Sequence, residues 1–361
     1  MKNINQNAEP LYRWIFRKED NLNQVVFLFI SKKNAINARF SPLFFSSKTI
    51  RVVYLSGCSF KYLDKTIMLA GKRLFSLKVK KVKLYKILHV FDFNIISSVP
   101  IQVLHIDDPK YSKKEVNDIL LWESTLSRTN KKSILIVTNS YTKNWFLNHL
   151  SKTEIIIIEQ GFHNLDKNRI IVKEEKKDFV CAYSSNFIHY GSDKHGNDTT
   201  WGARYLLDEV IPKITNLDPT IKFCLIGELG KQSEIKISTY SNVKAYGRVS
   251  FEKNMELLMT CDIALYPRLI DHRRSILKIF SYIGADLPIV AIDLIDTEIV
   301  KREDLGFVAT DIDDFVLKVL ELKNSNFLME RFKRNIQRIK VDFTWDNLSL
   351  KMENYLQKYL S

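Results

Sequence analysis

The chain has 361 residues, of which 45% are hydrophobic and 27% charged, and a formal net charge of +14. This composition excludes a low-complexity or fibrous protein and suits two domains of ordinary size. Four cysteines without CxxC spacing indicate neither a zinc site nor a disulfide framework, so we expect a reducing, cytoplasmic location. The polar N-terminus resembles no signal peptide and no apolar run approaches the ~18 residues of a membrane span, so we expect any membrane contact to be peripheral.

The positive charge is confined to the first half of the chain. Residues 1–150 carry 25 Lys/Arg and 10 Asp/Glu, a net charge of +15, whereas residues 151–361 carry 30 and 31, a net charge of −1. The first half is therefore expected to face an anionic partner, with nucleic acid, anionic lipid headgroups and a polyphosphate-linked acceptor as candidates.

The first half alternates strand-like and helical segments. Short, continuously apolar runs predict strands, which we place at residues 25–30, 51–55, 89–96, 102–106, 133–138 and 154–159. Helical periodicity is clearest at residues 113–126 and 142–150. Alternating strands and helices predict a parallel sheet with crossover helices.

A charged, aperiodic stretch at residues 161–178 is interpreted as an interdomain linker. A second alternating set follows it, with strands predicted at residues 179–183, 221–226, 243–246, 263–266 and 289–292. Helices are predicted at residues 202–214, 276–283, 313–322 and 345–359, the third capped by Asp313 or its neighbour and the last by Thr344. The fold class is therefore α/β, with two Rossmann-like doubly wound domains facing a cleft, and ligands are expected at the carboxyl ends of the strands.

A basic loop, Asp271 to Ser275, opens the helix predicted at residues 276–283. Arg273, Arg274 and Ser275 lie in the loop, and Lys278 follows within the first turn. Cations beside a helix N-terminus form an anion site in outline. The alternative is a solvated basic loop in which Ser275 caps the helix.

The stretch LKIFSYIGADLPIVA, together with the order of elements over residues 179–358, resembles the nucleotide-sugar half of GT-B glycosyltransferases of the family 4 or group 1 type. The matching family stretch reads K-x-F-E-Y-x-A-x-G-x-P-V-V, so Lys278 matches and Asp286 takes a glycine position. The resemblance implies two acidic donor contacts, whose positions here hold Ser281 and Arg273. Ser281 can still hydrogen-bond a ribose hydroxyl, and Arg273 can still hold phosphate.

Three further segments match donor contacts of the family. Tyr246, Gly247 and Arg248 resemble the segment whose backbone contacts the nucleobase, or form a simple strand-exit turn. Gly227 resembles a strand-end glycine that lets the backbone approach the ligand. Lys194 is the nearest match to a phosphate-binding lysine, in a loop that can equally be solvated.

In the first half, the sequence VLHIDDPKYS places His105 and Asp107 at the end of a strand. Either side chain can serve as a general base on an acceptor hydroxyl, and a His near this point contacts the sugar in the family that the chain resembles. The alternative is an acidic turn before proline, which also includes Asp108. Asp311 and Asp313 fit a D-x-D metal motif but directly precede a helix, so we interpret them as capping and expect no metal and no cofactor.

The densest basic run covers residues 72–86. Phe75, Val79 and Val82 share one helical face, which indicates an amphipathic element for an anionic membrane, but a twisted edge strand with solvated lysines fits as well. The candidate membrane or acceptor residues are Lys72, Arg73, Lys78, Lys80, Lys81 and Lys83. The run does not show the aromatic-interleaved signature of a nucleic-acid-binding segment, so we expect no nucleic-acid partner.

The C-terminal stretch FTWDNLSLKMENYL resembles the family's terminal helix, which implies a helix that crosses back to the first domain. The expected organisation is an acceptor domain at 1–165, a nucleotide-sugar domain at 166–344 and a crossover helix at 345–361. The resemblance implies a metal-independent hexosyltransferase that moves a sugar from a nucleoside diphosphate sugar to a lipid-linked or surface polysaccharide precursor. It would work at the inner face of a membrane. An inactive scaffold and a nucleotide-sugar epimerase are the alternatives.

Overall fold

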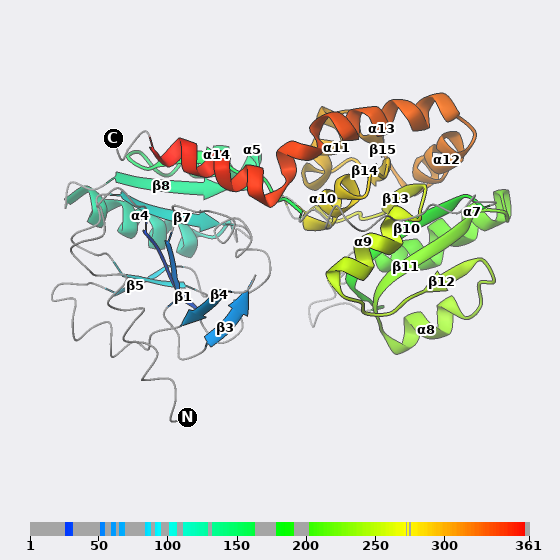
Figure 1. Ribbon diagram of the computed structural model, residues 1–361, viewed down its shortest axis with the longest axis horizontal. Coiled ribbons are helices and arrows are strands. Elements are labelled where there is room, and N and C mark those ends of the chain that lie inside the picture. The colour runs from blue at the N-terminus through cyan, green and yellow to red at the C-terminus, as the bar shows by residue number, and fades with distance from the viewer. Residues whose placement is uncertain are drawn as a thin grey trace. The chain divides into compact units, whose positions relative to one another are not determined.

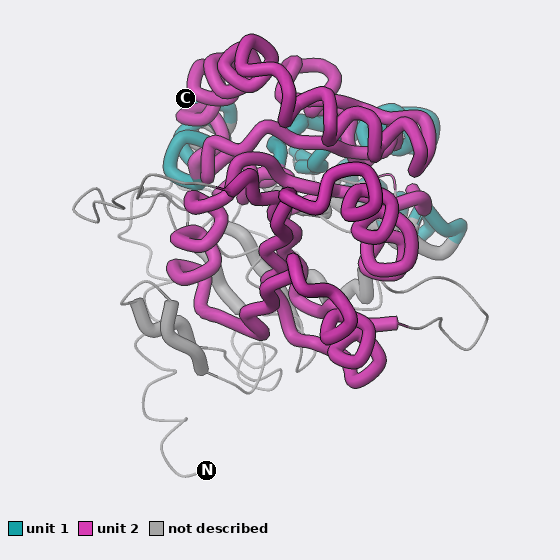
Figure 2. Tube along the Cα trace, turned by 90° about the vertical axis from the view of Figure 1, so that its right-hand side faces the viewer, with its two compact units in different colours: residues 1–159, 345–361 teal, residues 160–344 magenta. Residues whose placement is uncertain are grey.

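The structure is a computed structural model, and the chain divides into two compact units (Figures 1 and 2). Unit 1 comprises Met1–Glu159 with Trp345–Ser361, and unit 2 comprises Gln160–Thr344. The residues described by the structure are 26–31, 51–54, 59–62, 65–68, 84–87, 91–94, 101–106, 111–128, 132–162, 178–190, 202–271, 273 and 276–357.

Unit 1 contains parallel and antiparallel strands. Its described strands are β1 (Val26–Ser31), β2 (Arg51–Tyr54), β3 (Ser59–Tyr62), β4 (Lys65–Met68), β5 (Leu84–Ile87), β6 (Phe91–Asn94), β7 (Ile101–Ile106), β8 (Lys132–Val137) and β9 (Glu154–Ile157). Strands β7, β8 and β9 form a parallel sheet, and β1 pairs in parallel with β2. However, β6 pairs antiparallel with β1 and β5, and β3 pairs antiparallel with β4.

The antiparallel pairs differ from the parallel sheet that the sequence predicts for this half, and β3, β4 and β5 were not predicted. Their sequences, SFKY, KTIM and LYKI, explain the omission, because each contains polar residues and none is a continuous apolar run. Continuous apolar runs are typical of strands covered on both faces, whereas antiparallel strands often have one solvated face. Strand β5 includes the end of the basic run, where it favours the strand interpretation over the helical one.

Helices and loops hold the β7–β9 sheet in place. The described helices of unit 1 are α4 (Lys113–Arg128), α5 (Ser140–Leu147) and α14 (Trp345–Gln357). Asn139 caps α5 by accepting the N–H of Thr142 at 2.8 Å. The buried carboxylate of Glu123 on α4 accepts the N–H groups of Lys152 and Thr153, at 2.7 and 2.6 Å, just before β9. The C-terminal helix belongs to this unit, where Tyr355 hydrogen-bonds Glu154.

Unit 2 is built on a six-stranded, entirely parallel sheet. Its strands are β10 (Val180–Ile188), β11 (Lys222–Leu229), β12 (Val243–Ala245), β13 (Ile263–Tyr266), β14 (Ile289–Ile292) and β15 (Gly306–Ala309). Their order in the sheet is β12-β11-β10-β13-β14-β15. Counted along the chain this is 3-2-1-4-5-6, the doubly wound order of dinucleotide-binding domains.

Helices cover both faces of this sheet. They are α6 (Ala203–Tyr205), a π-helical segment η1 (Leu206–Val210), α7 (Ile211–Leu217), α8 (Lys231–Ile237), α9 (Phe251–Met259), α10 (Leu277–Gly284), the 3-10 turn η2 (Ile295–Thr297), α11 (Glu298–Arg302), α12 (Ile312–Lys323), α13 (Asn326–Lys340) and the 3-10 turn η3 (Val341–Phe343). Neighbouring strand residues enter opposite cores, as Cys181 and Ala182 do in β10 and Ala264 and Leu265 do in β13. This period of two explains why the strands are apolar throughout.

The capping interpretation of the D-x-D sequence is confirmed. Asp311 is the N-cap of α12, and its carboxylate accepts the N–H of Asp314 at 2.9 Å. Asp313 lies in the first turn, where an acidic side chain favours the helix dipole.

The two connections between the units meet at one edge of unit 2. Phe162 lies in the stretch that was expected to be a linker, but it is buried and pairs with Thr344, and its N–H donates to the carbonyl of Phe343 at 3.0 Å. Its ring packs against Gly284 at the end of α10, where an added Cβ would lie 2.7 Å from the ring. In the part of the chain that the structure describes, no helix has the length and apolar character needed to cross a bilayer.

Candidate functional site

The topology of unit 2 indicates where a ligand binds. The strand order reverses between β10 and β13, so the connections from these neighbouring strands leave in opposite directions. A crevice is expected outside the carboxyl ends of two such strands. Strand β10 runs on to Ile188, but it pairs with β13 only at Cys181 and Ala182, so Tyr183 and Ser184 are the first residues beyond that pairing. Tyr266, Pro267 and Arg268 lie at and after the end of β13.

Three buried tyrosines join the two strands to helix α10. Tyr183, Tyr266 and Tyr282 are each no more than 1% exposed. The Tyr282 hydroxyl accepts the N–H of Ser184 at 3.0 Å and lies 3.4 Å from the carbonyl oxygen of Leu265, to which it can donate. Burial raises the pKa of Tyr183 and of Tyr282 well above the usual value, so both hydroxyls keep their protons.

Lys278, in the first turn of α10, lies over this tyrosine cluster. Its ammonium nitrogen is 4.7 Å from the ring centroid of Tyr183 and 5.5 Å from that of Tyr266. Aromatic faces attract a cation by roughly 0.5–2 kcal/mol each while leaving its N–H groups able to donate. The lysine therefore places a buried positive charge at the switch point, beside the N-terminus of α10.

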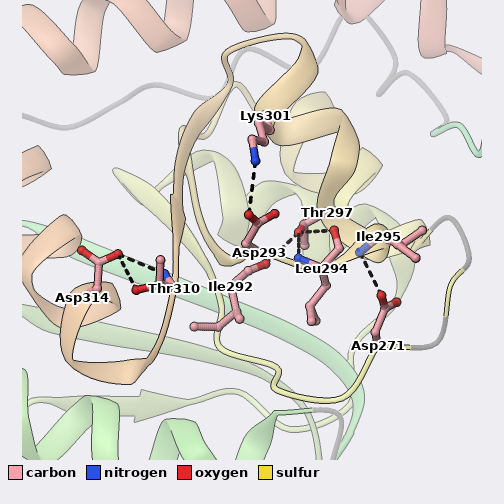
Figure 3. Close-up of polar contacts among 9 residues, drawn as sticks. All are labelled: Asp271, Ile292, Asp293, Leu294, Ile295, Thr297, Lys301, Thr310 and Asp314. Atoms are coloured by element: carbon pink, nitrogen blue, oxygen red, sulfur yellow. Dashed lines mark hydrogen bonds and ion pairs between the residues drawn. The ribbon is translucent and has the colours of Figure 1, made fainter.

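Two loops at this edge of the sheet are tied together by polar contacts. Buried Arg268 faces buried Asp296 of η2 at 3.8 Å, and its guanidinium is 3.5 Å from the Tyr266 hydroxyl. Asp271 accepts the N–H of Arg273 at 2.7 Å with one oxygen and the N–H of Ile295 at 3.0 Å with the other. Figure 3 shows Asp271 pointing from its loop to the backbone that follows β14.

The next two loops are held in a similar way. The Thr297 hydroxyl donates to the carbonyl of Ile292 at 2.7 Å, and Lys301 pairs with Asp293 at 3.2 Å (Figure 3). Beyond β15, the N–H of Thr310 donates to Asp314 at 3.0 Å. The loops at the carboxyl ends of β13, β14 and β15 are therefore ordered by polar contacts, and the first two form a platform for the Arg273 loop.

The predicted residues Arg273, Lys278 and Ser281 are brought to this platform. Arg273 has a φ of +55°, a left-handed conformation that non-glycine residues seldom adopt, and its side chain is exposed. The Ser281 hydroxyl donates to the carbonyl of Leu277 at 3.3 Å. Asp286, at the family's glycine position, has a φ of +59°, and Lys340 holds its carboxylate at 2.7 Å.

The other described donor candidates form a second group, at the carboxyl ends of β11 and β12. The N–H of Gly227 donates to the carbonyl of Gly247 at 2.9 Å, and Arg248 pairs with Glu228 at 3.5 Å on the surface. Tyr246, in the same turn, has the ammonium of Lys244 5.0 Å from its ring centroid.

The two glycines of that group have different reasons to be glycine. An added Cβ at Gly227 would lie 2.1 Å from the carbonyl oxygen of Ser185, so Gly227 lets β10 and β11 approach each other. The family resemblance had implied an approach to the ligand instead. Gly247 has open space around it, and its φ of +68° is what requires glycine.

Several predicted residues lie outside the described residues. In unit 2 these are Lys194, Arg274 and Ser275, and in unit 1 they are Asp107, Asp108, Lys72, Arg73, Lys78, Lys80, Lys81 and Lys83. His105 is the penultimate residue of β7, so its backbone lies at the carboxyl end of the parallel sheet of unit 1. Among the side chains that the structure describes, no three His, Cys, Asp or Glu residues gather as a metal site.

Sequence reasoning missed the residues that support the site. Arg268 and Asp296 are 28 positions apart, and neither belongs to a motif that the sequence analysis used. The one local signal was Tyr266-Pro267-Arg268, because an arginine directly after an apolar strand and a proline is unusual in a buried position.

Comparisons with known proteins agree with this architecture. No protein-family model and no curated protein matches the chain. The pneumococcal O-GlcNAc transferase GtfA, solved with UDP and GlcNAc, is 14% identical with a TM-score of 0.51, covering 72% of this chain and 52% of that one. TarM from S. aureus, solved with UDP, fondaparinux and alpha-GlcNAc-glycerol, is 17% identical with a TM-score of 0.50, and the match covers 71% of this chain and 50% of TarM. HepE from Anabaena, solved with UDP, is 14% identical with a TM-score of 0.51, and the match covers 71% of this chain and 72% of HepE.

The chain thus spans about half the length of GtfA and TarM. At these identities the likeness concerns the fold, and it agrees with the strand order of unit 2 and with the mixed α/β architecture. The chain has the GT-B glycosyltransferase fold.

Proposed function

We propose that this protein is a glycosyltransferase that uses a nucleoside diphosphate sugar as donor. The observation that carries the proposal is the position of Lys278, whose ammonium lies on two tyrosine rings at the switch point of a doubly wound unit. A cation at a helix N-terminus in this place suits a diphosphate. The GT-B fold, and the UDP present in the three structures named above, support the same class of ligand.

In the proposed reaction an acceptor hydroxyl oxygen attacks the anomeric carbon of the donor sugar. The bond between that carbon and the diphosphate oxygen breaks, the hydroxyl proton passes to a base, and the nucleoside diphosphate leaves. Lys278 and Arg273 would neutralise the charge that develops on the departing diphosphate, a task that needs no metal when cations are already in place. His105 or Asp107 is the proposed base.

The acceptor is proposed to be a hydroxyl of a lipid-linked or surface polysaccharide precursor, and the sugar a hexose. The net charge of +15 on residues 1–150 supports an acceptor carried by an anionic lipid. The enzyme would then work from the cytoplasm as a peripheral protein at the inner face of the membrane.

The test is a thermal-shift screen with UDP, GDP, dTDP, CMP and their sugars, on wild type and the variants Lys278→Met and Arg273→Ala. We expect one nucleotide to raise the melting temperature of wild type, with a smaller rise in both variants. Lys318→Met is the matched control, because Lys318 also lies on an aromatic ring, that of Phe307, at 4.5 Å. An equal rise in all four proteins, or none in wild type, would contradict the proposed donor site.

A second candidate is a nucleotide-sugar-binding protein that transfers nothing. It is favoured by Arg273 and Ser281, which stand where the family carries carboxylates. Release of nucleoside diphosphate that depends on an added acceptor would exclude it. Conversion of the donor sugar without an acceptor would instead indicate an epimerase.

A further inference from the structure

Four side chains that carry rings gather on one side of helix α5, in unit 1. Tyr141, Trp145 and His149 follow one another at intervals of four residues, which places them within about 80° around the helix axis. The Tyr111 ring contacts the first two edge to face, with its centroid 5.5 Å from that of Tyr141 and 5.2 Å from that of Trp145. The His149 ring lies 4.7 Å from the Trp145 ring. We define the α5 platform as Tyr111, Tyr141, Trp145 and His149.

The α5 platform is held by buried neighbours and still reaches solvent. The Trp145 ring packs edge to face on the fully buried ring of Phe146, at 4.7 Å between centroids. The Tyr111 hydroxyl is 2.8 Å from the hydroxyl of buried Thr142. Of the platform, His149 is exposed and the other three side chains are half-buried. Rings that packing already holds in place lose little conformational entropy when a ligand binds.

The platform lies at the carboxyl edge of the parallel sheet of unit 1. Helix α5 begins at Ser140, shortly after β8, and Tyr111 lies in the connection from β7 to α4. Because β7 and β8 are parallel neighbours, both connections leave the same edge of the sheet, where ligands bind in such folds. His105, one of the two proposed bases, is the penultimate residue of β7 and lies at this edge as well. Tyr111 has a φ of +49°, and left-handed backbone at non-glycine residues is concentrated at ligand sites.

The chemistry of the platform favours a sugar over other parts of an acceptor. None of its four members is an acid, a lysine or an arginine, and Lys143 of α5 lies about 160° around the helix from the platform's centre, so a phosphate gains little there. Tyrosine, tryptophan and histidine each combine an apolar ring with a polar tip. A pyranose ring uses both, because its C–H groups form an apolar face and its hydroxyls need donors and acceptors. An acyl or polyprenyl chain would gain nothing from the polar tips.

We propose that the α5 platform binds a sugar ring of the glycan acceptor. The inference rests on the proposed transferase, and it adds where the acceptor is held and that the saccharide is the part recognised. Trp145 and Tyr141 would pack on the C–H face of the sugar. The Nδ1 of His149 is 2.8 Å from the carbonyl oxygen of Trp145, so Nε2 is the atom that would bond a sugar hydroxyl. The bound sugar would then lie at the same sheet edge as His105.

The test is binding of the full chain to an array of bacterial oligosaccharides and polysaccharides, followed by calorimetric titration of the strongest binder. We expect Trp145→Ala and Tyr141→Leu each to weaken binding about tenfold, since each removes an aromatic face of about the size of a sugar ring. Trp145→Phe keeps a ring and should lose less. Tyr141→Leu keeps apolar contact with Tyr111, so its unfolding temperature should stay close to that of wild type.

Leu147→Ala is the matched control, because Leu147 is 50% exposed on the opposite side of α5 and should not contribute to binding. An equal loss in this control would overturn the proposal. Glycan binding that stays at the wild-type level in Trp145→Ala and Tyr141→Leu would overturn it too. The same holds if wild type binds no glycan on the array, or binds polyprenyl phosphate through these residues in place of a glycan.

A nucleotide thermal-shift series on the same proteins separates this proposal from the proposed function. The platform belongs to unit 1 and the proposed donor site to unit 2, so the shift should be the same in wild type and the platform variants. Nucleotide binding without glycan binding would overturn the platform and leave the donor site standing. Glycan binding that depends on Trp145 and Tyr141, without nucleotide binding, would support the platform and contradict the donor site.

Discussion

The hydroxyl of Tyr282 accepts the backbone N–H of Ser184 at 3.0 Å, so a side chain of helix α10 hydrogen-bonds strand β10 just past the residues that pair with β13. The two residues are 98 positions apart. The same helix carries Lys278, so one element contacts this part of β10 and carries the candidate phosphate-binding cation. Tyr282 is therefore expected to contribute both to stability and to the geometry of the donor site.

Replacing Tyr282 with phenylalanine should lower the free energy of unfolding by about 1–3 kcal/mol, because it leaves the half-buried N–H of Ser184 without this acceptor. Urea unfolding would measure the change. Tyr240→Phe is the control, since the Tyr240 hydroxyl donates to the carbonyl of Leu207 at 2.6 Å but its side chain, unlike that of Tyr282, is only half-buried, so it should matter less. Equal losses in the two variants would contradict a special role for Tyr282.

The glycines Gly227 and Gly247 should respond differently to alanine. An alanine at 227 places its Cβ 2.1 Å from the Ser185 carbonyl oxygen, so β10 or β11 must move, and we expect a loss of roughly 3 kcal/mol or more. An alanine at 247 meets no atom within 4 Å and should cost about 1–2 kcal/mol through its positive φ alone. Chemical denaturation of both variants measures the two losses of stability. A larger loss for Gly247→Ala than for Gly227→Ala would contradict the different roles given to these glycines.

Asp296→Ala should destabilise unit 2 by about 3–5 kcal/mol, because it leaves the charge of Arg268 buried without this carboxylate. The exposed pair of Lys301 and Asp293 is the matched comparison, and Asp293→Ala should cost under about 1 kcal/mol. Equal losses in the free energy of unfolding for the two variants would show that burial of the ion pair does not determine the size of the loss.

The contact between Asp218 and Lys323 should make stability depend on acidity. Hydrogen bonds from Lys323 and Thr220 hold the pKa of Asp218 below its ordinary 3.8. The folded state then binds fewer protons than the unfolded state, so the stabilisation is complete at neutral pH. It is lost as the pH falls from about 4 through the folded-state pKa.

Asp218→Asn should therefore lower stability at neutral pH and flatten its decline in acid. Urea midpoints measured from neutral to acidic pH would show this as converging curves for wild type and variant. Curves that stay parallel throughout would contradict the assignment.

Local patterns in the sequence were sufficient for most strands and several helices of the second half, but β15, α8, α11 and α13 were not predicted. Continuous apolar runs predicted β13 and β14, periodic apolar residues predicted α10, and the acidic residues before α12 predicted its cap, because each depends on neighbours within a few positions. The antiparallel strands β3 to β5 were missed, since each contains polar residues and none is a continuous apolar run.

Tertiary structure alone decided the arrangement of the site. The order 3-2-1-4-5-6, the bond between Tyr282 and Ser184, and the facing of Arg268 and Asp296 all join residues distant along the chain. Strand order and the direction of each side chain determine which buried polar groups contact one another. The sequence by itself determined most strands of unit 2 and which charged residues follow them along the chain. Packing determined which of these charges, such as Arg268, became buried and which, such as Arg273, remained exposed.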